Sequence, residues 1–94
     1  MKDTPSPFKR REEPLLEILH KLLYVNGWSR LLHAETVPGT RLLRIRRRDL
    51  GAAGDFSDAD VVGLYTDEEY RDGRITRQSI QAACRTFVLE RLSD

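Results

Sequence analysis

The first strong pattern of apolar positions covers residues 15–25, where apolar side chains recur at the spacing of an α-helix. The stripe consists of Leu15, Leu16, Ile18, Leu19, Leu22, Leu23 and Val25. Pro14 suits the first turn, because the backbone N–H that proline lacks would have no partner there. Asn26-Gly27 is a stop signal, since glycine adopts the left-handed conformation that closes many helices. The pattern therefore predicts an amphipathic helix that begins near Pro14 and ends before Gly27.

Residues 28–48 are best interpreted as a β-hairpin. The segment Val37-Pro38-Gly39-Thr40 fits a type II turn, which favours proline at its second position and glycine at its third. After the turn, apolar residues and arginines alternate in part, so the apolar ones are expected to face a core and the arginines to face water. The apolar positions are Leu43 and Ile45, and the alternating arginines are Arg44, Arg46 and Arg48.

The run from Trp28 to Glu35 admits two interpretations. It can form the partner strand of the hairpin, which gives a two-stranded ribbon. It can instead form a short helix, because residues 30–35 contain no β-branched side chain of the kind that favours strands. The second interpretation would make the fold all-α.

Three helix-start signals follow in the second half of the chain. Each pairs a hydroxyl residue with a polar partner three positions later, and each has apolar residues where a hydrophobic staple needs them. The signals are Ser57 with Asp60, Thr66 with Glu69 and Thr76 with Ser79, and the staple pairs are Phe56 and Val61, Tyr65 and Tyr70, and Ile75 and Ile80. Two short helices are expected to end near Gly63 and Gly73. The third is expected to be long, with Ile80, Ala83, Cys84, Phe87, Val88 and Leu92 on one face.

These elements predict an α+β fold in which the first and last helices pack over a two-stranded ribbon. The 94 residues suffice for one domain, which we place at residues 12–94 after a flexible basic arm at residues 1–11. No apolar run is long enough to span a membrane, so no membrane partner is expected. The single cysteine excludes an internal disulfide framework and favours a cytoplasmic location.

The net charge of +1 conceals a strong segregation of charge along the chain. Residues 1–48 hold 11 basic and 5 acidic side chains, whereas residues 49–72 hold 1 basic and 8 acidic ones. Five of the basic side chains lie within eight residues, at Arg41, Arg44, Arg46, Arg47 and Arg48. This cluster is a candidate surface for the phosphate backbone of a nucleic acid. Two alternatives compete: a strand edge that its charge protects from aggregation, and internal pairing with the acidic segment 55–72.

The segment 66–80 is similar to a helix-turn-helix, with a short capped helix, a glycine turn and a second helix that starts with polar side chains. Such a helix start can reach base edges and phosphates in the major groove. The expected base readers are Arg77, Gln78 and Gln81, and the expected phosphate contacts are Arg74 and Arg85. The competing interpretation is an ordinary capped helix with a polar face.

Nothing in the sequence marks a catalytic, metal or cofactor site. Cys84 lies on the apolar stripe of the last helix, which is typical of a buried structural thiol. His20 and His33 lie 13 residues apart, with no cysteine near either to complete a metal-ligand motif. We therefore expect a protein that is not an enzyme.

Two functions of different class remain. The first is a small regulatory protein that binds nucleic acid through the arm residues Lys9, Arg10 and Arg11, the arginine strand and the start of the last helix. The second is a protein-interaction module, such as an adaptor or inhibitor, whose segregated charge matches a charged partner. A homodimer is possible in either case, through the first or last helix. The position of the strand arginines relative to the chain's own carboxylates discriminates between the two functions.

Overall fold

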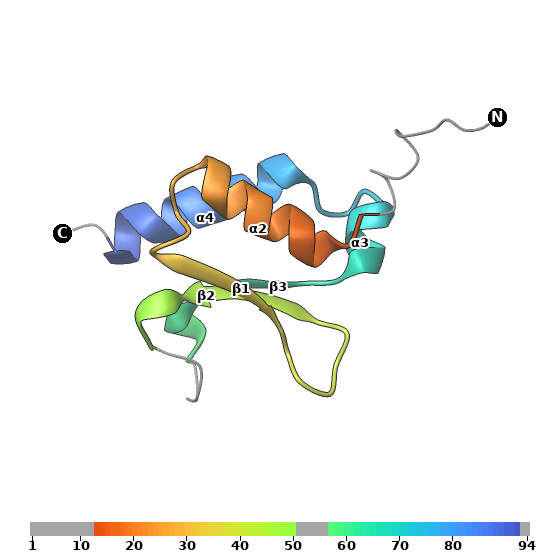
Figure 1. The fold of residues 1–94 in the computed structure, drawn as a ribbon, viewed down its shortest axis with the longest axis horizontal. Helices are drawn as coiled ribbons and strands as arrows, with labels where there is room; N and C mark the ends of the chain where they lie inside the picture. Colours follow the sequence, from red (N-terminus) through yellow and green to blue (C-terminus); the bar gives the residue numbers. More distant parts are fainter. Residues whose placement is uncertain (1–12, 51–56, 93–94) are drawn as a thin grey trace.

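The computed structural model describes residues 13–50 and 57–92, and Figure 1 shows how they fold. The elements in chain order are α2 (Leu15–Val25), β1 (Leu32–Thr36), β2 (Leu43–Arg47), the 3₁₀ turns η1 (Arg48–Leu50) and η2 (Asp58–Asp60), β3 (Val61–Tyr65), α3 (Asp67–Arg71), α4 (Arg77–Phe87) and the π-helical turn η3 (Val88–Leu92). The predicted α+β class and the long C-terminal helix are confirmed. The predicted arm, residues 1–11, and the staple residue Phe56 lie outside the described residues.

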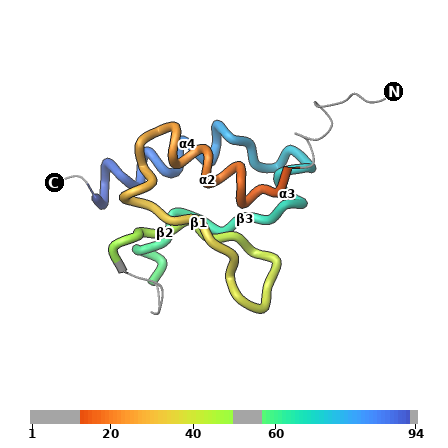
Figure 2. Tube along the Cα trace, in the orientation of Figure 1, coloured from red at the N-terminus to blue at the C-terminus, as the bar shows by residue number. Residues whose placement is uncertain are grey.

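The three strands form one antiparallel sheet in the order β1-β2-β3, and helices α2 and α4 lie on the same side of it (Figures 1 and 2). The core lies between the two helices and the sheet. Its fully buried side chains come from both layers and are Leu15, Leu19, Leu32, Ile45, Ile80 and Cys84. None of the helices in the described part of the chain has the length and apolar character needed to cross a membrane.

Helix α2 follows the predicted pattern closely. Five of the residues in the predicted stripe are buried, namely Leu15, Ile18, Leu19, Leu22 and Leu23. Pro14 occupies the cap position just before the first turn. At the other end the Asn26 side chain donates a hydrogen bond to the Leu22 carbonyl at 2.8 Å, and Gly27 has a φ of 77°. The helix therefore ends where the Asn-Gly signal places its end.

The predicted hairpin is confirmed from Leu32 onward, and the helical alternative for residues 28–35 is wrong. The first strand is shorter than predicted, because residues 28–31 form a turn in which the N–H groups of Leu31 and Leu32 bond to the Trp28 carbonyl. β1 pairs with β2 from Leu32 opposite Arg47 to Thr36 opposite Leu43. The turn has the type II geometry, with a φ of 77° at Gly39 and a 3.1 Å hydrogen bond from the Thr40 N–H to the Val37 carbonyl. Pairing with β2 satisfies the backbone of a segment whose own residues only weakly favour a strand.

The sheet has a third strand where the sequence predicts a short helix. The Ser57 cap forms with Asp60, but the helix it starts is only the three-residue turn η2. Val61–Tyr65 then forms β3 along the second edge of β2, with a register irregularity between Ile45 and Arg46. The expected two-stranded ribbon is therefore incomplete. The reason is non-local: β2 has a second edge of unpaired backbone groups, and the apolar, partly β-branched β3 segment satisfies them.

The last two predicted helix starts are confirmed. The Thr66 side chain accepts a hydrogen bond from the Glu69 N–H, and the Thr76 side chain accepts one from the Ser79 N–H, each at 3.1 Å. Gly73, which has a φ of 80°, separates the two helices. On α4 the predicted face buries Ile80, Cys84 and Phe87 against the core. These caps depend on residues at most three positions apart, so the sequence alone is enough to place them.

Replacing Gly39 tests the hairpin turn. We expect Gly39→Ala to lower the free energy of unfolding by about 1–2 kcal/mol, because a side chain is strained at positive φ. No atom lies within 4 Å of the position where the added Cβ would sit, so the cost is one of backbone conformation alone. Gly39→Asn should cost less, because asparagine tolerates the left-handed region. Urea denaturation measures both, and equal losses would contradict the assigned turn.

Candidate nucleic-acid interface

The arginines of β2 are held mainly by carboxylates of this chain. The Glu35 carboxylate, on β1, accepts hydrogen bonds from Arg44 Nε at 2.8 Å and from Arg46 Nε at 2.9 Å. Arg46 Nη2 donates to the other oxygen of Glu35 at 3.1 Å, and Arg46 Nη1 donates to the Arg47 carbonyl at 2.8 Å. One carboxylate therefore binds two guanidinium groups.

The strand register explains this cluster. Glu35 lies directly opposite Arg44, and His33 lies opposite Arg46, so Arg46 is the diagonal neighbour of Glu35. The side chain of Arg46 is only 3% exposed, and that of Arg44 is 21% exposed. A guanidinium buried to this degree is stable only beside a partner such as Glu35. Arg46 is thus a structural residue and is not available to a phosphate.

The same contacts set the ionisation of Glu35. Burial by itself raises the pKa of this carboxyl group, but the hydrogen bonds from Arg46 and Arg44 outweigh that effect and lower the pKa below its usual value. The carboxylate is therefore charged at neutral pH.

The other three predicted strand residues differ from one another. Arg47 forms two hydrogen bonds with the Asp49 carboxylate, at 3.0 and 2.8 Å, and its Nη1 lies 3.9 Å from Asp60. Arg48 is exposed and donates to the Ser29 carbonyl at 2.8 Å. Arg41 is exposed in the segment that leads into β2. Of these five arginines, only Arg41 and Arg48 have no carboxylate partner within residues 13–50 and 57–92.

Internal pairing, which the sequence left as an alternative, thus involves three of the five arginines, namely Arg44, Arg46 and Arg47. Among the described residues its main partner is Glu35, which precedes the strand and reaches it across the hairpin. The described part of the acidic segment, residues 57–72, contributes the long contact of Asp60 with Arg47. A hairpin brings neighbours in sequence into register, and this proximity decides which carboxylate the arginines meet.

The start of α4 is more open. Arg77 and Gln78 are exposed, Gln81 is half-buried, and Arg85 is exposed two turns further on. Arg74, by contrast, donates to Asp72 at 3.0 Å. Three of the predicted residues help to line a hollow of about 460 Å³ between α4 and α2. Its lining residues are Glu13, Ile18, Lys21, Leu22, Val25, Asn26, Arg77, Gln78 and Gln81.

The short capped helix α3, the turn at Gly73 and the polar start of α4 are all present, but the packing of a helix-turn-helix is not. Helix α3 has five residues and none of them is buried. Its apolar contact with the core comes from the partly buried Tyr70, which is narrower than the apolar face that holds the first helix of that motif against the second. Helix α4 is instead positioned by the core, where its buried residues meet α2 and the sheet.

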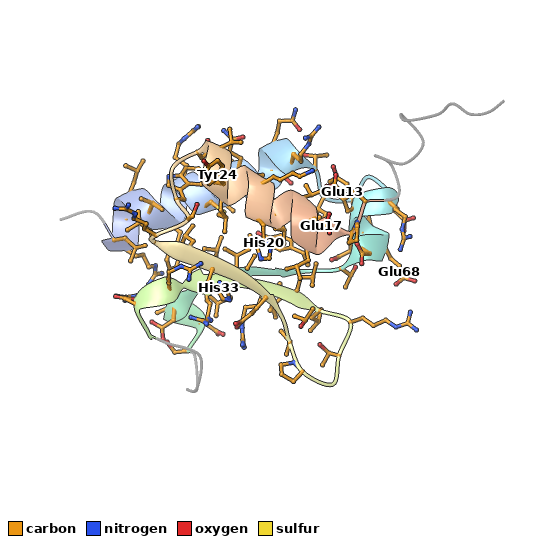
Figure 3. The ribbon with its side chains drawn as sticks, in the orientation of Figure 1. Glu13, Glu17, His20, Tyr24, His33 and Glu68 are labelled. Carbon is orange, nitrogen blue, oxygen red and sulfur yellow. The ribbon has the colours of Figure 1, made fainter. Side chains whose placement is uncertain are left out.

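The fold brings the two histidines together, which the sequence did not indicate. The ring centroids of His20 on α2 and His33 on β1 are 6.5 Å apart, and both residues are labelled in Figure 3. His20 Nε2 donates to the Ala34 carbonyl at 2.9 Å. His33 Nδ1 accepts from Arg48 at 3.2 Å, and its Nε2 lies 3.6 Å from Glu35. The described residues contain no group of three or more potential metal ligands.

Burial and neighbouring cations keep His33 neutral. Desolvation lowers the pKa of its imidazole most, and the charges of Arg48 and Arg46 lower it further, against the opposing effect of Glu35. Cys84 is fully buried, and burial raises the pKa of its thiol to about 12, as expected for a structural cysteine.

Comparison with protein families, with curated proteins and with solved structures finds no match for this chain.

Replacing Glu35 tests the arginine cluster. We expect Glu35→Gln to lower the free energy of unfolding by about 3 kcal/mol, because it removes the charge that faces the buried Arg46 guanidinium. Urea denaturation at pH 7 measures the loss. Glu17→Gln, on the exposed face of α2, is the control and should change stability by less than about 0.5 kcal/mol. Equal effects of the two substitutions would contradict the structural role of Glu35.

The histidine contacts predict a pH dependence. The pKa of His33 is below its ordinary value of 6.5 in the folded protein, so folding favours the neutral ring. Its contribution to stability is complete above pH 6.5 and declines as the pH falls from there through the folded pKa. An NMR titration should place the midpoint of the His33 ring below 6.5, and Arg48→Ala should raise it. A midpoint at or above 6.5 would show that the described surroundings of this ring are wrong.

Proposed function

We propose that this protein binds nucleic acid, without catalysis, through the start of α4 and the adjoining part of α2. The observation that carries the proposal is the contrast between two groups of candidate residues. The strand residues Arg44, Arg46 and Arg47 bind carboxylates of the chain itself. Arg77, Gln78 and Gln81 stand at a hollow on the helix side, where an external ligand can reach them.

The backbone at this helix start favours an anion. The Thr76 side chain accepts a hydrogen bond from the Ser79 N–H, and the Ser79 side chain accepts one from the Thr76 N–H. The Ile80 N–H donates to the Thr76 carbonyl. The N–H groups of Arg77 and Gln78 have no such bond to another described residue. They add to the positive end of the helix dipole, which attracts phosphate.

The side chains extend this surface along α4. Arg77, Gln81 and Arg85 are spaced four residues apart, so they follow one another along one side of the helix. No ion pair involving Arg77 or Arg85 is found within residues 13–50 and 57–92. Guanidinium groups bind two phosphate oxygens at once, and side-chain amides of glutamine can pair with base edges. This side of α4 can thus contact both the phosphates and the base edges of a nucleic acid.

A protein partner is the second candidate function. Tyr24 and Val25, at the end of α2, are 77% and 80% exposed, and Val25 borders the same hollow. Exposed apolar residues beside a concavity are also typical of protein-binding surfaces. Binding that survives nuclease treatment and is insensitive to salt would favour this function over the first.

The test is a fluorescence-anisotropy titration with 20-base-pair DNA and RNA duplexes and single strands. We expect binding at low salt whose logarithm falls linearly with the logarithm of the salt concentration. Arg77→Ala should lower the affinity for every probe roughly three- to tenfold. It should also reduce the magnitude of the slope of log affinity against log salt concentration by about 1.

Arg30→Ala is the matched control, because Arg30 is exposed and lies in the turn between α2 and β1, outside the hollow. It should leave the salt slope nearly unchanged. Absence of binding to all probes at low salt would overturn the proposed function, and so would equal losses for the two variants.

A further inference from the structure

We infer that the hollow between α2 and α4 receives an unpaired nucleotide of the bound strand, so that the preferred substrate is a nucleic acid with a bulged or unstacked base. This inference rests on the proposed function and specifies its substrate class. It depends on the shape and the composition of the hollow, and these do not depend on the arginines of β2.

The shape of the hollow argues against a regular duplex as its occupant. Its volume of about 460 Å³ lies within the range of about 300–1,000 Å³ that is typical of small-ligand pockets. A ligand group that enters this hollow must project toward it. In a regular duplex the bases are stacked inside and present only their edges, whereas a bulged or single-stranded base can be turned outward as a whole.

The composition of the hollow matches the parts of a nucleotide. Val25, at the end of α2, gives the hollow an exposed apolar wall against which a base can lie, and Ile18 and Leu22, which are only 8% and 7% exposed, also line the hollow. Polar side chains border this wall with donors and acceptors that can pair with base edges. They are Asn26 on the α2 side and Gln78 and Gln81 on α4.

The charges place the phosphate at one end. Lys21 also lines the hollow, but it is tied to Glu13 in an ion pair. Arg77 has no carboxylate partner among the residues that the structure describes, and it stands at the first turn of α4. A phosphate bound at Arg77 would leave the attached base within reach of the apolar wall. The ligand is therefore expected to enter with its phosphate toward α4.

The test compares a perfect RNA or DNA duplex with the same duplex that carries one bulged 2-aminopurine nucleotide. We expect the bulged duplex to bind roughly tenfold more tightly, which is the scale of one base contact. The fluorescence of 2-aminopurine should change on binding, because the base leaves water for the hollow. Anisotropy gives the affinity, and the 2-aminopurine signal reports where the base goes.

Two neighbouring substitutions make the test specific. Val25→Asp and Tyr24→Asp change the net charge equally and replace side chains of nearly equal exposure, but only Val25 lines the hollow. Val25→Asp should abolish the preference for the bulge and the fluorescence change, whereas Tyr24→Asp should keep both. Salt-dependent binding without any bulge preference in the unchanged protein would overturn this inference and leave the proposed function intact. Equal loss of the preference in the two variants would also overturn it.

Discussion

The contact of Glu35 with Arg44 and Arg46 governs much of this structure. It ties β1 to β2 and allows a nearly buried guanidinium group to exist beside the core layer. Without the carboxylate, the charge of Arg46 would oppose the burial of the strand that carries Ile45. The two guanidinium groups in turn keep Glu35 ionised, because they lower its pKa against the effect of burial. The sheet is thus held by an ion cluster on one face and by apolar packing on the other.

This cluster also decides which arginines can meet a partner. A dense run of arginines suggests a phosphate-binding surface, but a hairpin places a carboxylate opposite them before any partner arrives. The available charge and amide groups then lie on the helix layer, at Arg77, Gln78 and Gln81. Both proposals therefore place the binding residues on α4 and not on β2, since the hollow that we assign to a nucleotide is formed by α2 and α4.

Prediction from the sequence succeeded where the signals are short in range. The caps at Thr66 and Thr76 and the turn at Gly39 each depend on residues at most three positions apart, and all three are present in the structure. The Ser57 cap also forms, yet the helix expected after it does not, because Val61–Tyr65 completes the sheet beside β2. The competition there is between a local preference for a helix and a long-range pairing, and the pairing satisfies more backbone groups.

By itself, the amino-acid sequence determined the apolar faces of α2 and α4, the turn at Gly39 and the helix caps, because each follows from the spacing of neighbouring residues. The pairing of β1 with β2 then decided between the α+β and all-α folds that the sequence left open. Tertiary structure alone decided that β3 is a strand, that Glu35 binds two arginines, and that His20 lies beside His33. It also decided that the polar start of α4 faces a hollow. The physical reason is that burial, strand register and the approach of distant side chains arise only when separate elements pack together.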